Sequence, residues 1–441
     1  MMSEPARARR LAAETLVPLV LAVLAIVFVA LQVQSYTRLS PIDELQHIDS
    51  LYRAPAAPAP ADRVGQEAMR QQDCRGVDAP GFEPGPCRPL GSFDPATYQE
   101  KGYNTAAANT PLYYTATRGL AEVVQAATPA DDLVTAGRLA GGVWLALGLV
   151  LTYVAGRRRG VGRSPLLVVG ALLAAAPGLQ FPGGTITPDA WGLLVGAALL
   201  LAVTWWEERP SNARAAVLVL VAVVVALVKL TNLIGVAAVA FYLLLDRGHD
   251  DKQWPGRTRR TVTGLVTVGV AVLAAGAWLA VVSSRPQMDP NDLPDMVTRF
   301  HTPAFPWIGL IDNSLVLVQP LAGPTPVGIL TLSVLATSLV SLVLVSGTVA
   351  AAVFATSPER SVSLARGVLL AAVLGALALV VMGYLFSGSY FPLPPRYGLS
   401  LLAPMAVVTA ACLRTRTSVA VAGAVAAIAL AASAARLIGL L

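Results

Sequence analysis

The chain of 441 residues is 55% hydrophobic and only 13% charged, whereas an ordinary soluble domain carries about 25% charged residues. This composition excludes a soluble globular protein and indicates one that crosses a membrane several times. The formal net charge of +6 does not indicate nucleic-acid binding, because the basic residues are concentrated in short segments between apolar runs.

Apolar runs of about 20 residues, the length that a helix needs to cross a bilayer, recur along the chain. They predict an all-α, polytopic bundle of about eleven transmembrane spans. The predicted spans lie near residues 14–35, 132–155, 164–180, 189–206, 213–230, 232–246, 261–283, 326–355, 364–386, 397–413 and 417–439.

Lys and Arg in the connecting segments set the orientation, because short cytoplasmic loops carry an excess of basic residues. Placing the N-terminus in the cytoplasm puts every strongly basic loop on that side and most acidic residues outside. The Ala, Gly and Arg bias indicates a bacterial genome, and therefore the cytoplasmic membrane of a bacterium. The basic loop residues are Arg157, Arg158, Arg159, Arg163, Arg247, Lys252, Arg257, Arg259, Arg260, Arg414 and Arg416.

The predicted spans divide the chain into successive parts. The first apolar stretch is too long for a signal peptide and no A-x-A-like cleavage site follows it, so it is expected to be a retained signal anchor. Short cytoplasmic loops without a Walker-type sequence disfavour an ATP-driven transporter. The parts are 1–35 (cytoplasmic N-terminus and anchor), 36–131 (long outer loop), 132–283 (helices two to seven), 284–325 (second outer loop) and 326–441 (helices eight to eleven).

The two outer loops carry folding signals of their own. Cys74 and Cys87 lie in an oxidising compartment and are expected to form a disulfide, with two free thiols as the alternative. The sequence "NTPLYYTATRGLAEVVQAA" (109–127) predicts a helix along the membrane surface, with Thr110 as its cap and Pro111 in its first turn. The second loop mixes Pro, aromatic and acidic residues, which predicts surface helices or a lid.

The segment "SPIDELQH" follows directly on the first span. One interpretation is a capping box, in which Ser40 caps a surface helix, a proline takes its first position and Asp43 closes the box. This interpretation leaves Glu44 and His47 unexplained. On a helix the two acids and the imidazole can share one side, and a carboxylate at a low-dielectric boundary tends toward the raised pKa of a general base. Asp43 and Glu44 are therefore the candidate catalytic residues.

Other charged residues lie near the outer ends of predicted spans. Asp189 precedes the fourth span. It either faces the same cavity as Asp43 or lies near a helix N-terminus, where the macrodipole favours an acidic residue. Arg138 lies about two turns inside the second span, where a charge is costly unless it is paired or faces a cavity. Arg396 and Arg138 suit the phosphate of a lipid-linked substrate. For Lys229 and Arg118, snorkelling to the interface is an equal alternative.

Aromatic residues and histidines add little chemistry by themselves. An interfacial belt explains most of the aromatic residues, and stacking on a sugar is a further role for one or two of them. The histidines show no metal-ligand spacing, so no cofactor is expected, although carboxylates could hold a divalent cation. The aromatic residues are Tyr113, Tyr114, Trp191, Trp307, Tyr390 and Tyr397, and the histidines are His47, His249 and His301. The candidate substrate-binding set is His47, Asp189, Arg138, Arg396, Tyr397 and Lys229.

Several of these motifs resemble those of a known superfamily. The acidic pair after the first span, the long first outer loop, "NTPLYYT" before the second span, the acid before the fourth and "RYGLSLLAP" near the end resemble the GT-C superfamily of polytopic glycosyltransferases. In particular the chain is similar to the DUF2142 group of bacterial membrane proteins, whose opening motif is similar to P-x-D-E-x-x-H. The likeness covers most of the sequence.

The resemblance implies transfer of a sugar from a polyprenyl-phosphate carrier to an envelope glycan, lipid or protein acceptor on the outer face, without a nucleotide sugar. In such enzymes an acid of the first outer loop is the base, which corresponds here to Asp43, with Glu44 as the second choice. The acid that corresponds to Asp189 supports the acceptor or the base. Arg396 and Arg138 are the candidates for binding the donor phosphate.

Two other interpretations stay open at this point. A lipid or polysaccharide transporter or flippase would place charged residues deep in several spans along a continuous path, whereas here they collect on the outer side. A non-catalytic envelope scaffold would leave Asp43, Glu44 and Arg396 pointing apart. Convergence of these side chains on one cavity would favour an enzyme over a scaffold.

Overall fold

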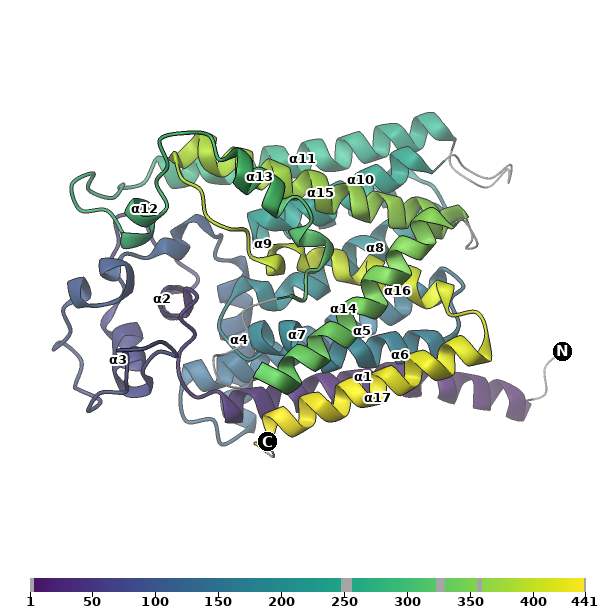
Figure 1. The fold of residues 1–441 in the computed structure, drawn as a ribbon, viewed down its shortest axis with the longest axis horizontal. Coiled ribbons are helices and arrows are strands. Elements are labelled where there is room, and N and C mark those ends of the chain that lie inside the picture. The colour runs from purple at the N-terminus through teal and green to yellow at the C-terminus, as the bar shows by residue number, and fades with distance from the viewer. Residues whose placement is uncertain (1–3, 247–255, 323–329, 355–358, 440–441) are drawn as a thin grey trace.

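The structure is a computed structural model that describes residues 4–246, 256–322, 330–354 and 359–439. Over these residues the regular elements are helices, and no β-strand is present (Figure 1). The all-α class expected from the sequence is therefore confirmed. Arg247, Lys252, His249 and the start of the span expected at 326–355 lie outside the described residues.

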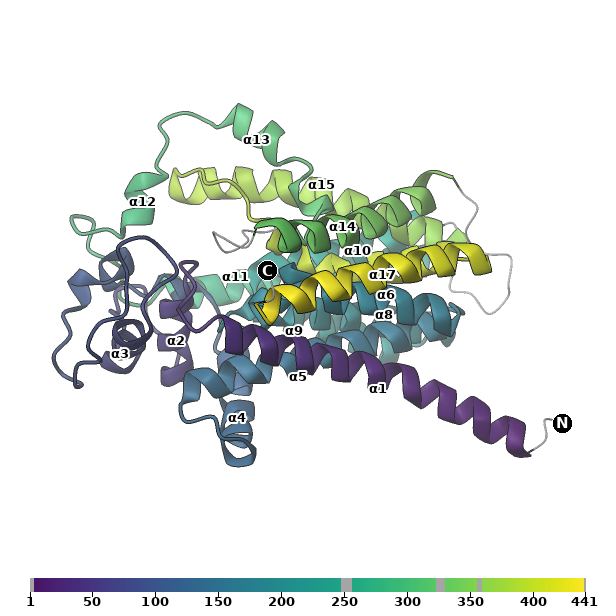
Figure 2. The same cartoon turned by 60° about the horizontal axis from the view of Figure 1, so that its bottom comes forward.

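Long apolar helices run side by side and form the main body of the molecule (Figures 1 and 2). Each predicted apolar run coincides with one or two helices over its described residues. The helices of the body are α1 (Glu4–Ser35), α5 (Leu133–Arg158), α6 (Arg163–Ala175), α7 (Pro177–Gly183), α8 (Gly192–Glu208), α9 (Asn212–Val228), α10 (Leu233–Leu245), α11 (Arg257–Ser283), α14 (Leu330–Val353), α15 (Glu359–Ser387), α16 (Leu402–Cys412) and α17 (Arg416–Leu437).

Within the described residues, seven helices are long and apolar enough to cross a membrane. The straight span expected at 164–180 is instead broken into α6 and α7, which meet at 61° and would give an eighth crossing. The break arises because Pro177 lacks a backbone N–H and favours an extended conformation at Ala176, whose ψ is 117°. Helices α9, α10 and α16 are shorter, with 17, 13 and 11 residues. The count of about eleven crossings stays a prediction.

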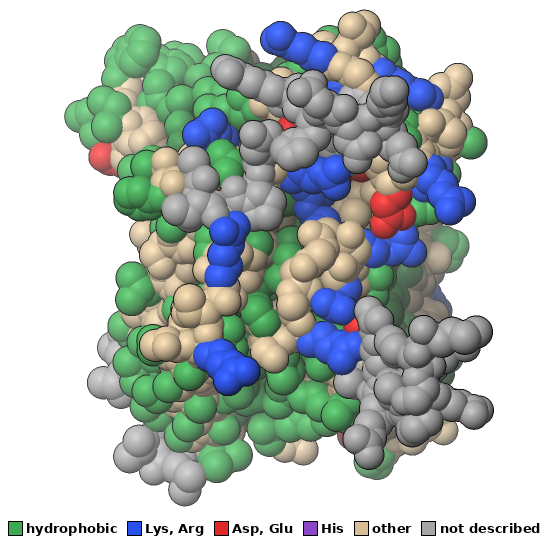
Figure 3. All heavy atoms as spheres, turned by 90° about the vertical axis from the view of Figure 1, so that its right-hand side faces the viewer, with side chains coloured by type: hydrophobic (Ala, Val, Ile, Leu, Met, Phe, Trp, Pro, Cys, Tyr) green, Lys and Arg blue, Asp and Glu red, His purple; other side chains and the backbone are tan. Residues whose placement is uncertain are grey.

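One end of the helical body is basic. The labelled chain ends lie at opposite ends of the body in Figures 1 and 2, and Figure 3 shows Lys and Arg side chains gathered on the face at the N-terminal end. Ion pairs tie the helix ends together there: Glu14 Oε1 lies 2.7 Å from Nη2 of both Arg157 and Arg163, and Arg158 Nη1 lies 2.9 Å from Glu208 Oε2. This is the charge distribution that the positive-inside rule requires of the cytoplasmic end.

Close backbone contact fixes the short helix α7 against α5. A Cβ atom on Gly141 would lie 1.8 Å from the carbonyl oxygen of Gly183, so only glycine is accommodated at position 141. On the opposite face of α7, a Cβ atom on Gly178 would lie 2.6 Å from the carbonyl oxygen of Leu321. These contacts hold α7 in place as a wall of the cavity described below.

The first outer loop folds around a small apolar core of its own. Leu45, Ile48, Leu51 and Met69 of α2 (Glu44–Arg53) and α3 (Gln66–Arg75) are fully buried, as is Tyr113 of α4 (Leu112–Ala127). The helix expected at 109–127 is present as α4, but Pro111 and not Thr110 takes its N-cap position; its place along the membrane surface stays a prediction. Because this core packs against the start of α5 and residue 186, the loop is fixed to the end of the helical body.

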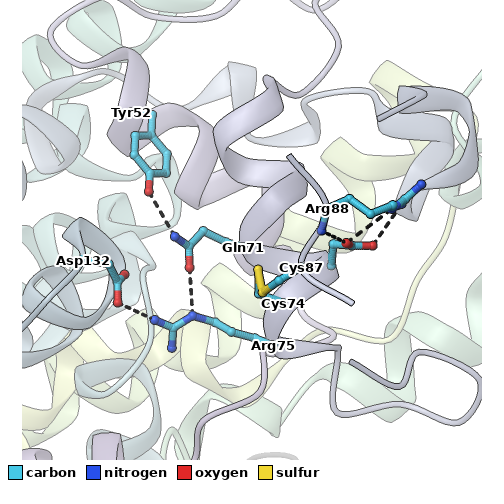
Figure 4. Close-up of a disulfide and its surroundings, with 8 residues drawn as sticks. Tyr52, Gln71, Cys74, Arg75, Cys87, Arg88 and Asp132 are labelled. Carbon is cyan, nitrogen blue, oxygen red and sulfur yellow. Dashed lines mark hydrogen bonds and ion pairs between the residues drawn. A yellow bond between two sulfur atoms is a disulfide. The ribbon is translucent and has the colours of Figure 1, made fainter. Parts of the chain in front are cut away.

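A disulfide joins Cys74 at the end of α3 to Cys87 (Figure 4). Beside it, Arg88 pairs with Asp73 at 2.9 Å. Arg75 Nη2 donates to Asp132 Oδ2 at 2.7 Å, and Asp132 in turn caps α5 by accepting from two backbone N–H groups. Figure 4 shows how these contacts connect the disulfide-bearing segment to the outer end of α5.

The second outer loop lies against the first. It contains α12 (Asp295–Arg299) and α13 (Trp307–Asn313), both short. Asp292 accepts from Arg63 at 2.6 Å and from Lys101 at 3.1 Å, and Glu100 accepts from the backbone N–H of Met296 at 2.7 Å. We call this set of contacts between the two loops the roof.

Candidate functional site

A cavity of about 260 Å³ lies where the outer loops meet the helical body. Its walls are assembled from distant parts of the chain: the start of α2, the turn at 105–109, α7, the turn at 188–191 (η4, Pro188–Trp191), the turn at 395–401 (η7, Pro395–Leu401), α14 and α17. One part of the lining is apolar, with Pro177, Phe181, Pro182 and Leu321. The ionisable and aromatic polar residues that line it are Asp43, His47, Asp189, Lys229, Arg396, Tyr397 and Arg436.

Asp43 stands at the N-cap position of α2, and the expected capping box is not formed. The helix begins at Glu44 and not at Pro41, and Asp43 has the left-handed conformation φ 57°, ψ 12°. The reason is that the Ser40 backbone N–H donates to Glu44 Oε2 at 2.7 Å, while the Ser40 hydroxyl accepts from Ile42. Glu44 therefore accepts the hydrogen bond from the Ser40 backbone that the capping box predicts for Asp43. Asp43 lines the cavity instead.

The Asp43 carboxylate carries no ion pair with any described residue. Burial raises its pKa above the ordinary value of an aspartic acid, and the positive charges of Arg396 and Lys229 oppose this rise only in part. A carboxylate that is accessible to a cavity and has a raised pKa is suited to accept a proton near neutral pH.

His47 lies one turn further along α2, as expected from the spacing, and lines the same cavity. Its Nδ1 is 2.7 Å from the Tyr114 hydroxyl of α4. Burial, with the charge of Lys229 as the next contribution, lowers the pKa of His47 to about 3. The imidazole is therefore neutral at physiological pH, and it contributes hydrogen bonding rather than charge.

Asp189, Lys229 and Arg396 form a charge cluster on another wall, in which Asp189 is buried and the two cations are partly exposed. Lys229 Nζ donates to Asp189 Oδ1 at 2.5 Å, and Arg396 Nε donates to Asp189 Oδ2 at 3.0 Å. The ring of Tyr397 lies 4.8 Å from Lys229 Nζ and 5.5 Å from the Arg396 guanidinium carbon. With two cations on one carboxylate the cluster carries an excess positive charge, and Asp189 is too strongly paired to act as the base.

Local backbone features place these three side chains. Lys229 interrupts the apolar run between α9 and α10 in an extended conformation, with φ −159° and ψ 131°. Asp189 follows Pro188 in η4, where Thr187 accepts from its backbone N–H. Arg396 follows Pro395 in η7. Each charge thus lies at a break in a helix and not on a helix surface that faces lipid, which is where an intramembrane charge is tolerated.

Two expected site residues do not line the cavity. Glu44 and Arg138 form a buried pair in which both side chains are 1% exposed. Arg138 Nε and Nη2 donate to Glu44 at 2.9 and 2.8 Å, and the same guanidinium donates to the carbonyls of Tyr36 and Arg38. Arg138 therefore neither extends to the membrane interface nor faces the cavity, where a phosphate could bind. The role predicted for it in substrate binding is wrong for this geometry.

Arg436, near the end of α17, lines the cavity but was not among the expected residues. Its side chain is buried, with 6% exposure. The sequence did contain a signal, namely a single arginine in the otherwise apolar run at 417–439. An intramembrane charge of this kind is a functional candidate in its own right.

Two other expected residues, Arg118 and Tyr113, make contacts that stabilise the fold. Arg118 donates to the backbone carbonyls of Tyr52 and Ala54 and so attaches α4 to the end of α2. Tyr113 packs edge-on against Trp191. No group of three or more His, Cys, Asp or Glu side chains that could hold a metal ion is found over the residues that the structure describes.

Comparison with known proteins gives little that bears on this chain. No family model and no curated protein matches it. Among solved structures, it is similar to the single-particle cryo-EM structure of the arabinofuranosyltransferase AftD from Mycobacteria, at 14% sequence identity and a TM-score of 0.44. That match covers 95% of this chain and 26% of the AftD chain, so this chain spans about a quarter of AftD. No residue role follows from this likeness.

Proposed function

We propose that the protein is a membrane glycosyltransferase that moves a sugar from a polyprenyl-phosphate-linked donor to a hydroxyl acceptor of the cell envelope. The observation that carries the proposal is the composition of one cavity. Asp43, whose carboxylate forms no ion pair within the described part of the chain, borders it together with an excess of positive charge around Lys229 and Arg396. These are the two groups that transfer from a phosphate carrier needs, a base for the acceptor and cations for the departing phosphate.

The proposed reaction is a single displacement. The acceptor oxygen forms a bond to the anomeric carbon as the bond between that carbon and the carrier phosphate oxygen breaks. The acceptor proton passes to Asp43, and the bonding electrons pass to the phosphate, whose charge Arg396 and Lys229 stabilise. Because the base and the phosphate lie on opposite faces of the sugar, the configuration at the anomeric carbon is inverted.

The apolar part of the cavity suits the lipid carrier. Pro177, Phe181, Pro182 and Leu321 continue from the charged lining, so a polar head and the first isoprene units can be held at once. In this proposal the basic end of the helical body is cytoplasmic, all eleven predicted apolar segments cross the bacterial cytoplasmic membrane, and the cavity opens on its outer side.

Donor consumption by purified protein tests the proposal. Protein in lipid nanodiscs is incubated with a panel of polyprenyl-phosphate sugars and an envelope extract as acceptor, and the released polyprenyl phosphate is measured. Asp43→Asn should lower the rate by about 10²- to 10⁴-fold, the usual contribution of a general base. Asp131→Asn, an exposed acid of the same outer loop, is the matched control and should retain full activity.

The same assay separates the proposed enzyme from a flippase. A flippase moves the labelled lipid across the bilayer of a proteoliposome and leaves the sugar–phosphate bond intact. Lipid movement without donor consumption, or full activity of folded Asp43→Asn protein, would refute the proposal.

A further inference from the structure

The Arg436 guanidinium is incompletely hydrogen bonded. Its Nη2 donates to Gln32 Oε1 of α1 at 2.8 Å and to Gln180 Oε1 of α7 at 2.7 Å. Its Nε is buried without a hydrogen-bond partner, and its Nη1 has no partner among the described residues. Since a guanidinium has five N–H donors, three of them have no acceptor among the described residues, and Arg436 lines the cavity.

The charge of Arg436 is also not offset by an acidic side chain of the described residues. Three arginines of the described chain are buried. Arg138 pairs with Glu44, and Arg260 pairs with Asp246 at 2.6 Å, whereas both described partners of Arg436 are neutral amides. A buried charge without a counter-charge is strongly unfavourable, so an anion that enters the cavity gains both free donors and an unbalanced charge.

The amide network holds Arg436 in position before any ligand arrives. Gln180 Nε2 donates to the Ala174 carbonyl at 2.8 Å, which fixes the amide so that its oxygen faces α17. That oxygen also accepts from Ser433, one turn before Arg436, at 2.9 Å. Because Gln180 belongs to α7 and accepts from Arg436, the guanidinium is fixed beside the apolar wall that α7 supplies to the cavity.

The charges around the cavity match those of the proposed reaction. Lys229, Arg396 and Arg436 are cationic, Asp43 and Asp189 are anionic, and His47 is neutral, so the ionised lining has one excess positive charge. A polyprenyl-phosphate sugar carries one negative charge. When Asp43 takes the acceptor proton, the excess rises to two, and the polyprenyl phosphate released approaches two negative charges. Without Arg436 the lining would lack one positive charge in both states.

We infer that Arg436 binds the phosphate of the lipid carrier, next to the apolar wall, and acts together with the cluster of Lys229 and Arg396. The inference rests on the proposed function, and it adds a second cationic element, contributed by the last described helix. The recognised chemistry is a phosphate attached to an isoprenoid chain.

Equilibrium binding of the product tests this inference without any need for turnover. Radiolabelled polyprenyl phosphate is titrated onto the full-length protein in detergent micelles, with polyprenol, inorganic phosphate and phosphatidic acid as competitors. Arg436→Gln should weaken binding about 10- to 100-fold, the cost of losing hydrogen bonds to a charged group, and Arg436→Lys should recover most of it. Arg88→Gln is the matched control, because it removes one positive charge from an exposed arginine of the first outer loop that does not line the cavity, and it should bind within about twofold of wild type.

The possible outcomes separate this inference from the proposed function. The inference is supported if the wild-type protein binds polyprenyl phosphate, polyprenol does not compete for this binding, and the loss of affinity is confined to Arg436→Gln. Unchanged binding by folded Arg436→Gln protein overturns it and leaves the proposed function standing. Failure of the wild-type protein to bind polyprenyl phosphate overturns both. Equal competition by inorganic phosphate or phosphatidic acid overturns the assignment to an isoprenoid carrier.

Discussion

Glu44→Gln should destabilise the protein strongly, even though the substitution preserves size and shape. The Glu44 carboxylate accepts four hydrogen bonds: two from Arg138 at 2.9 and 2.8 Å, one from the Ser40 backbone at 2.7 Å and one from the Ile186 backbone at 3.0 Å. It thereby joins the end of α1, the start of α5 and the turn after α7. In the variant an amide NH₂ faces hydrogen-bond donors, and the Arg138 charge loses its counter-charge and keeps the carbonyls of Tyr36 and Arg38 as acceptors.

The magnitude follows from the burial of the pair. Both side chains are 1% exposed, and removal of one partner of a buried ion pair costs about 3–5 kcal/mol. We expect a loss of that size in the free energy of unfolding, measured by titration with SDS in mixed micelles. Glu122→Gln is the matched control, because Glu122 pairs with Arg118 at the surface with 61% of its side chain exposed, and it should cost less than about 0.5 kcal/mol.

A double variant sharpens the test. Replacing Glu44 by Gln and Arg138 by Met together removes both charges, and such replacements of a buried pair are often neutral in stability. The double variant should therefore be more stable than Glu44→Gln alone, which gives a favourable coupling between the two positions. Wild-type stability of Glu44→Gln together with loss of transferase activity would refute this reasoning and make Glu44 the catalytic base.

Other variants test the remaining parts of the site. Because burial raises the pKa of Asp43 and the base acts when ionised, kcat/KM should fall as pH is lowered through that raised pKa, and the limb should be absent from the residual activity of Asp43→Asn. Folding lowers the pKa of His47 from 6.5 to about 3, so the unfolded chain binds a proton that the folded chain does not; thermal stability should fall as pH drops between these values, and His47→Gln should remove that part of the fall. Asp189→Asn leaves two cations unneutralised and should lower thermal stability in a way that added polyprenyl phosphate partly reverses, whereas an unchanged melting temperature would contradict the cluster. Loss of the Cys74–Cys87 bridge, which closes a loop of 13 residues, should cost about 3 kcal/mol and expose the outer loop to protease without changing polyprenyl phosphate binding.

Much of the fold was predictable because the bilayer limits the possibilities. A helix in hydrocarbon must satisfy its own backbone and must be apolar, so the runs at 14–35 and 417–439 indicate helices directly. Pro177 also implies the break at Ala176. The apolar run around Pro177, however, predicts a single span at 164–180. The span count stays open because α9, α10 and α16 are short.

The site was only partly predictable, because pairing in space leaves no local pattern. The sequence predicts Asp43, His47, Asp189, Lys229 and Arg396 near the outer side, and in the structure these five residues line one cavity. Nothing in the sequence indicated that Glu44 and Arg138, 94 residues apart, form a pair. The predicted capping box is not formed for a related reason. Arg138, which is distant in sequence, holds Glu44 in place, so Glu44 and not Asp43 accepts the hydrogen bond from the Ser40 backbone.

Under the proposed function, the roof has a consequence for the entry of the acceptor into the cavity. Its ion pairs are partly exposed, with Asp292 at 45%, Lys101 at 39% and Arg63 at 31%, and each such pair is worth less than about 1 kcal/mol. Met296, whose backbone bonds to Glu100, lines the cavity below. These ion pairs therefore oppose separation of the two loops only weakly, and added salt should accelerate entry of a bulky acceptor by screening their charges. Turnover with a large glycan should then respond to ionic strength more than turnover with a small alcohol.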